Sequence, residues 1–240
     1  MRHAIIGDIH GRYRQLEKIL YELCIFKTLG GWRNSKNYHI VQLGDLNDYQ
    51  AEGDYSSVRA LEIMMELTKA GIATVLYSNH HDKLMRYLNG NKITPSHGLT
   101  ETIKELDECS LDFKGELYTW LSKLPCIYEF IENKKSYICA HAFFDEYMFK
   151  QMNSDPHWDE TKKSRDFFEG ICIYGKRTTV HGTERVKWWD EDCTNLFKSF
   201  HFIGGHYHVE KFADNYTLLD NDDFIVCWIP STGEVIREPK

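Results

Sequence analysis

Two hydrophobic patterns alternate along the first half of the chain. Short apolar runs that predict buried strands occupy residues 4–7, 39–43 and 72–77. Apolar residues recur at helical spacing over 12–26, 58–68, 99–109 and 113–124. Ser56 or Ser57 is placed to cap the second of these helices, and Gly71 is placed to end it. The first half is therefore predicted to alternate strand and helix.

The second half of the chain is predicted to be mostly strand. The segments 127–131 and 137–140 flank a polar turn and predict an antiparallel hairpin, and further strands are expected at 200–203, 216–219 and 224–229. The stretch 145–198 has no clear period and is expected to be largely loop. Together the two halves predict an α/β (α+β) fold with two packed sheets and helices on their outer faces. Without repeats or linkers, residues 1–240 are predicted to form a single domain.

Composition narrows the functional classes. The 240 residues are 42% hydrophobic and 27% charged, which is typical of a globular protein. Seven cysteines, odd in number and without a CxxC pair, predict a reducing, cytoplasmic location and no disulfide scaffold. A net charge of −7 argues against a stable nucleic-acid complex or binding to an anionic membrane. The sequence shows neither an apolar run of membrane-spanning length nor a signal peptide at its start.

Five predicted strands end in residues that can bind a metal ion, in the segments 7–10, 44–48, 78–80, 140–142 and 204–208. Carboxylate, amide and imidazole groups suit Mn, Fe, Zn or Mg. In an extended segment Asp8 and His10 lie on one face, and so do His206 and His208, so each pair can reach one ion. Any one of these residues alone would more commonly be a buried polar group with satisfied hydrogen bonds. Five such strand ends together predict a metal site at a sheet edge.

These segments also carry a family resemblance. In order, GDIHG, GDLND, SNHHD, AHA and GHYH resemble the motifs of the calcineurin-like metallophosphoesterase superfamily, over nearly the whole chain. The likeness is to small bacterial and phage members: the lambda-type protein phosphatase, the bacterial diadenosine tetraphosphatases, and the phosphatase module of bacterial polynucleotide kinase-phosphatase. Residues 79–91 and 97–106 are most similar to the symmetric dinucleoside-tetraphosphatase branch.

The resemblance implies a four-layer αββα sandwich that holds two divalent ions, with Mn first and Fe, Zn, Ni or Mg as alternatives. The implied metal ligands are Asp8 and His10 for the first ion, Asp45 as the bridge, and Asn79, His141 and His206 for the second. A metal-bridging hydroxide would attack phosphorus, and His80, oriented by Asp48, would protonate the leaving oxygen.

Three departures from the family motifs bear on the substrate. Tyr49 stands where the superfamily has an arginine that clamps phosphate, and Tyr77 replaces a second candidate clamp. His208 matches the extra imidazole that joins the first metal in phosphodiesterase branches. Lys176 and Arg177 align with a phosphate-binding stretch of the relatives, although a solvated loop explains them equally well.

These departures favour nucleotide-type phosphodiesters, cyclic phosphates or dinucleoside polyphosphates as substrates. The expected binding partner is therefore a phosphorylated small molecule or a nucleotide. Two alternatives stay open. One is a serine/threonine protein phosphatase or general phosphomonoesterase, and the other is a non-catalytic module that binds metal or phosphate. The complete set of ligands and the His80–Asp48 pair argue against the non-catalytic module.

Overall fold

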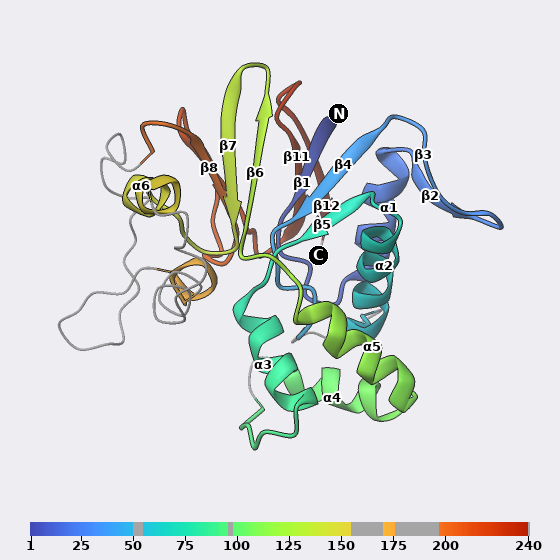
Figure 1. Ribbon diagram of the computed structural model, residues 1–240. Helices are drawn as coiled ribbons and strands as arrows, with labels where there is room; N and C mark the ends of the chain where they lie inside the picture. The colour runs from blue at the N-terminus through green and yellow to red at the C-terminus, as the bar shows by residue number, and fades with distance from the viewer. Residues whose placement is uncertain (50–54, 96–97, 155–169, 176–196, 240) are drawn as a thin grey trace.

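Two five-stranded sheets lie face to face in the computed structural model, which describes residues 1–49, 55–95, 98–154, 170–175 and 197–239 (Figure 1). The first sheet has the order β12 (Glu234–Pro239), β11 (Phe224–Ile229), β1 (Arg2–Ile6), β4 (Tyr38–Gln42) and β5 (Ala73–Val75). The second has the order β6 (Ile127–Glu132), β7 (Lys135–Ala140), β8 (His201–Gly204), β10 (Tyr216–Leu219) and β9 (Glu210–Phe212). Each sheet contains parallel and antiparallel pairs. The prediction of two mixed sheets flanked by helices is confirmed.

Alternating side chains divide the apolar core into layers. In β1, Ile5 points toward the second sheet, whereas Ala4 and Ile6 point toward the helices. In β8, Ile203 joins the layer between the sheets and Phe202 joins the outer layer. The two sheets therefore bury their inner faces against each other, as sandwich packing requires.

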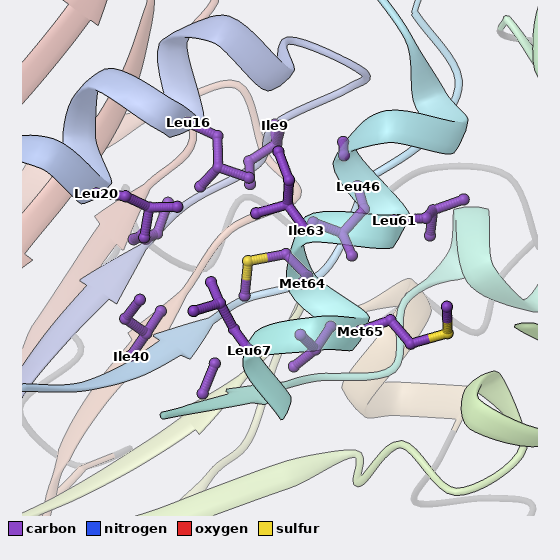
Figure 2. Close-up of a cluster of buried hydrophobic side chains, with 14 of the residues drawn as sticks. Ile9, Leu16, Leu20, Ile40, Leu46, Leu61, Ile63, Met64, Met65 and Leu67 are labelled. Carbon is purple, nitrogen blue, oxygen red and sulfur yellow. The ribbon is translucent and has the colours of Figure 1, made fainter. Parts of the chain in front are cut away.

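Helices cover the outer face of the first sheet. α1 (Tyr13–Glu22) and α2 (Ser57–Lys69) pack on its strands, and three further helices follow them, α3 (Asn79–Leu88), α4 (Leu99–Asp107) and α5 (Leu111–Leu121), with α4 against α2 and α3 against α5. Ser56 caps α2 as expected, because its side chain accepts a hydrogen bond from the Arg59 N–H at 3.0 Å. Figure 2 shows Leu16 and Leu20 of α1 with Met64 and Leu67 of α2 packed over this sheet.

Several elements differ from the prediction. The helix expected over 12–26 ends at Glu22, and a hairpin of β2 (Ile25–Thr28) and β3 (Gly31–Asn34) follows. Cys24 adopts a left-handed backbone with φ 58°, which ends the helical path although the apolar spacing continues to Phe26. The expected loop over 145–198 contains the helix α6 (Glu146–Ser154), on the outer side of the second sheet (Figure 1). The strands β9 and β12 were also not predicted, because their polar sequences lie at sheet edges.

Two negative predictions can be checked in the described part of the chain. The six cysteines described there form no disulfide with one another. None of the described helices is both long enough and apolar enough to cross a lipid bilayer.

Candidate metal centre

The predicted ligand residues follow strands that run in the same direction within each sheet. β1 and β4 are parallel and lead into Asp8 and Asp45, while β7 and β8 are parallel and lead into His141 and His206. The carboxyl ends of parallel strands lie at one edge of a sheet, so each pair of loops is brought together. The His141 Nδ1 atom lies 2.9 Å from the Leu43 carbonyl oxygen and joins the edges of the two sheets.

The site loops hold unusual backbone conformations. Five of the nine described non-glycine residues with positive φ are predicted site residues: His10 (49°), Asp45 (49°), Asp48 (69°), His206 (73°) and His208 (55°). A left-handed backbone costs a non-glycine residue on the order of 1 kcal/mol, and such costs concentrate at functional sites. The surrounding fold holds these side chains in orientations that ordinary turns do not provide.

A first group of potential ligand atoms comes from His10, Asp45 and His80. The Nε2 atoms of His10 and His80 lie 3.8 Å and 3.7 Å from Oδ2 of Asp45. The His10 Nδ1 donates to the carbonyl oxygen of Asn47 at 3.2 Å, which leaves the lone pair of Nε2 directed at the site.

A second group comes from Asp45, His141 and His206, with Asn79 beside it. The His141 Nδ1–H donates to the Leu43 carbonyl, so Nε2 carries a lone pair. That Nε2 lies 2.8 Å from Asn79 Oδ1, 3.0 Å from His206 Nδ1 and 3.5 Å from Asp45 Oδ1. Of these neighbours only the His206 nitrogen can carry a proton, and Asp45 Oδ1 accepts no hydrogen bond from the described residues. A divalent cation satisfies these converging atoms together, so the residues fit a metal ion.

Charge within the site is dominated by Asp45. Burial acts to raise the pKa of this carboxyl, but His141, His80, His10 and His206 together hold it well below its usual range. Burial acts to lower the pKa of His80, yet the carboxylates of Asp45 and Asp48 raise it above the ordinary value. Asp45 is therefore ionised and belongs to both ligand groups.

His80 is held by Asp48. The His80 Nδ1 donates to Asp48 Oδ2 at 2.7 Å, and Asp48 Oδ1 accepts from Asn47 Nδ2 and from the Thr102 hydroxyl, both at 2.7 Å. The Asp48 N–H donates to the Ser57 hydroxyl at 3.1 Å. Nothing in the sequence assigned Thr102 or Ser57 to the site, because a hydroxyl within a helical segment carries no signal until its contact is seen.

No profile of a known protein family matches the chain. The bis(5'-nucleosyl)-tetraphosphatase PrpE [asymmetrical] of Bacillus velezensis is 30% identical over 203 residues, which cover 78% of this chain and 79% of that protein. The chain belongs to the bis(5'-nucleosyl)-tetraphosphatase PrpE family. The PrpE protein of Oceanobacillus iheyensis is 30% identical over 151 residues, and this chain spans only 58% of its length.

One solved structure has a fold similar to that of this chain. The crystal structure of a candidate diadenosine tetraphosphatase is 19% identical, with a TM-score of 0.60 over 99% of this chain and 93% of that one. The resemblance to calcineurin-like metallophosphoesterases is confirmed by these relatives. The PrpE relatives carry the name asymmetrical, and the likeness of residues 79–91 and 97–106 to the symmetric branch stays a prediction.

The remaining predicted residues lie around the candidate metal centre in different ways. Asp8 is buried, and its Oδ2 accepts from the His206 N–H at 3.1 Å. The His208 side chain is 60% exposed, its Nδ1 lies 2.8 Å from Asp222 Oδ1, and it joins neither ligand group. Its role as a metal ligand stays a prediction. Tyr49 stacks on Tyr55 with ring centroids 4.9 Å apart, while Lys176 and Arg177 lie outside the described residues.

Proposed function

We propose that this protein is a metal-dependent phosphoester hydrolase that cleaves dinucleoside polyphosphates. The observation that carries the proposal is the pair of ligand groups that share Asp45, together with the buried Asp48 carboxylate that holds the His80 imidazole of the first group. The names of the PrpE relatives supply the substrate class. A reducing, cytoplasmic location agrees with the absence of disulfides among the six described cysteines.

We further propose that two divalent ions, with Mn first among Mn, Fe, Zn, Ni and Mg, occupy the two groups. Asp8, His10, Asp45, Asn79, His141 and His206 would hold them, and His208 is a further candidate ligand. When bound, such ions polarise the phosphoryl group and activate a water molecule for attack. Asp45, ionised and placed between the groups, supplies the negative charge that both ions need.

His80 is the proposed proton donor to the leaving oxygen. Its Nδ1–H is engaged by Asp48, so Nε2 is the nitrogen that faces the site, 3.7 Å from Asp45 Oδ2. Its raised pKa favours the protonated ring near neutral pH. As the P–O bond breaks, the proton on Nε2 passes to the departing oxygen, and Asp48 stabilises the imidazolium until that transfer.

The test compares metal-loaded wild type with His80→Ala on diadenosine tetraphosphate and on bis-nitrophenyl phosphate. Loss of the proton donor should lower turnover of the nucleotide by about 10²- to 10⁴-fold and that of the activated ester much less, because nitrophenolate leaves without a proton. Metal content, measured by elemental analysis, should be retained. Loss of metal from His80→Ala would instead make His80 a ligand of the first group.

Product analysis tests the substrate proposal separately. Hydrolysis of the P–O–P bridge next to a terminal phosphorus gives a nucleoside monophosphate and a triphosphate, whereas hydrolysis of the central bridge gives two diphosphates. We expect the first pair of products, as the names of the relatives indicate. A phosphopeptide or nitrophenyl phosphate cleaved faster than every dinucleoside polyphosphate would favour the protein phosphatase or monoesterase alternative.

A further inference from the structure

Arg12 lies next to the candidate metal centre and has unmet hydrogen-bonding capacity. It follows His10 by two residues and immediately precedes α1. Its Nε is buried and makes no hydrogen bond among the described residues, and its Nη1 reaches the Ile9 carbonyl only at 3.5 Å. Within the described part of the chain, no carboxylate forms an ion pair with it. The guanidinium also hydrogen-bonds to the Tyr55 side chain, but the buried Nε donor has no acceptor, which is costly unless a ligand supplies one.

Two tyrosines position this guanidinium. The Arg12 Cζ lies 5.3 Å from the centre of the Tyr55 ring, and Tyr55 in turn stacks on Tyr49 with an interplanar angle of 25°. Tyr49 lies against Gly11, where an added Cβ would stand 3.0 Å from Tyr49 Cδ1. Tyr49, which stands where the superfamily has an arginine, therefore supports Arg12 through the stacked Tyr55 ring.

Electrostatics connects Arg12 to the centre. Burial lowers the pKa of the Arg12 guanidinium, while Tyr55, Asp220 and Asp222 act in the opposite direction, so the group stays charged near neutral pH. The buried Asp220 also acts on the His141 imidazole, and its Oδ2 accepts the His208 N–H at 2.6 Å. One carboxylate thus acts on both the guanidinium and a ligand of the second group.

We propose that Arg12 is a specificity-determining residue that binds a phosphate of the polyphosphate chain next to the one held at the metal centre. The inference rests on the proposed function and deepens it, because it assigns the cation that compensates for the missing arginine at Tyr49. A planar guanidinium with several donors matches two phosphate oxygens at once. A substrate with a single phosphate gains nothing from this contact, so Arg12 favours substrates with several linked phosphates.

Binding of inorganic tripolyphosphate to the Mn-loaded protein, measured by calorimetry, tests the proposal without turnover. Arg12→Gln should weaken binding by about 10- to 100-fold, the loss expected for charge-assisted hydrogen bonds. Arg12→Lys, which keeps the charge and part of the volume, should fall between the two. Lys18→Gln removes the same charge from an exposed position on α1 and should change the affinity less than about two-fold. Equal affinity of Arg12→Gln and wild type would overturn the proposal.

Kinetics separates specificity from a general structural effect. Arg12→Gln should raise KM for diadenosine tetraphosphate while leaving kcat and the KM for bis-nitrophenyl phosphate close to the wild-type values. An equal rise in KM for both substrates would contradict the role, because only one of them carries a neighbouring phosphate. Tyr55→Ala should weaken tripolyphosphate binding, and Tyr55→Phe should weaken it less, because phenylalanine keeps the ring but lacks the hydroxyl that hydrogen-bonds to Arg12.

The two proposals fail in different ways. A wild-type protein that cleaves no dinucleoside polyphosphate contradicts the proposed function, whatever Arg12 does. A wild-type protein that cleaves them, combined with unchanged tripolyphosphate binding in Arg12→Gln, contradicts only the role of Arg12.

Discussion

Asp48 uses its two carboxylate oxygens for two different partners: Oδ2 receives the His80 Nδ1–H at 2.7 Å, and Oδ1 receives the Thr102 hydroxyl at 2.7 Å. Asp48 and Thr102 are fully or almost fully buried, and the Asp48 backbone is left-handed with φ 69°. The imidazole of His80 therefore cannot rotate without breaking a buried, charge-assisted hydrogen bond. The orientation of the proposed proton donor depends on a residue of α4, far from it in sequence.

Thr102→Val should impair catalysis without removing metal. The change deletes one donor to Asp48 Oδ1 and leaves the Asn47 amide as its other donor, which should cost about 1–2 kcal/mol of unfolding free energy. We expect a lower kcat on nucleotide substrates and unchanged metal content. Thr119→Val is the matched control, since that hydroxyl lies on an exposed face of α5 and donates to the Gly115 carbonyl. A Thr102→Val protein with wild-type kcat would show that Asp48 needs no such support.

Asp45→Asn should lose metal from both groups. Asp45 is common to both, and an amide at this position lacks the negative charge that offsets two cations. Elemental analysis should find less than one ion per chain, and added Mn should raise the melting temperature of the wild type but not of the variant. Asp222→Asn, at an exposed carboxylate, is the control and should keep the wild-type metal content. A loss of metal from Asp222→Asn would indicate that His208, which lies 2.8 Å from Asp222, is a ligand. Two ions retained per chain in Asp45→Asn would rule out its shared role.

Gly205→Ala should distort the site through sterics alone. A Cβ at Gly205 would stand 2.2 Å from Asp8 Oδ1, so the carboxylate must move. Metal affinity and turnover should both fall, as judged by titration of the apo protein with Mn. Gly115→Ala, on an exposed face of α5 with nothing within 4 Å of the new Cβ, should instead raise the unfolding free energy by about 0.5–1 kcal/mol. Normal Mn binding by Gly205→Ala would mean that Asp8 is not a ligand in its present position.

Acid should destabilise the fold through His201. Burial lowers the pKa of this imidazole to about 4, with Lys135 acting in the same direction and the Asp214 carbonyl in the opposite one. The unfolded chain therefore binds a proton that the folded chain does not between about pH 6.5 and 4. Stability is fully retained above pH 6.5 and falls as the pH drops through this window, by about 3 kcal/mol in total from this residue.

The measurement is urea unfolding of wild type and His201→Gln at several pH values. His201→Gln should show a smaller loss of unfolding free energy between pH 7 and pH 4. Thr217→Val is a suitable comparison, because it removes the hydroxyl that donates to His201 Nε2 at 2.8 Å but keeps the imidazole and hence the pH dependence. Parallel pH profiles for wild type and His201→Gln would contradict the assignment.

The sequence predicted the central strands and the polar strand ends that carry the candidate ligands, because both follow from local patterns. Apolar runs that end in Gly-Asp, such as 4–8 and 40–45, give a buried strand and a polar strand end together. The structure brings Asp45, His80 and His141 into contact as that reasoning expected. The hairpin after α1 was not predictable from spacing, because Ile25 and Phe26 continue the apolar pattern of the helix.

Arg12 shows why the rest of the site was harder to predict. A basic residue at the start of a helix ordinarily faces solvent, and nothing local distinguishes it from Arg14. Only the contact of Arg12 with Tyr55, and of Tyr55 with Tyr49, identifies it, and these contacts depend on the three-dimensional path of separate segments. His208 illustrates the opposite case, where a clear motif match leads to an exposed side chain next to Asp222.

The pairing of β1 with β11 has a consequence for how the protein is made. β1 delivers Asp8 and His10, but Ile5 lies opposite Trp228, in a strand that a ribosome makes long after β1. At about 5–20 residues per second, the first strand waits on the order of 10 s for this neighbour. His206 also emerges late, so the nascent chain carries scattered ligands and no finished site. We expect stable metal loading to begin only after β11 has been made, and truncation before β11 to give a protein that binds no ion tightly.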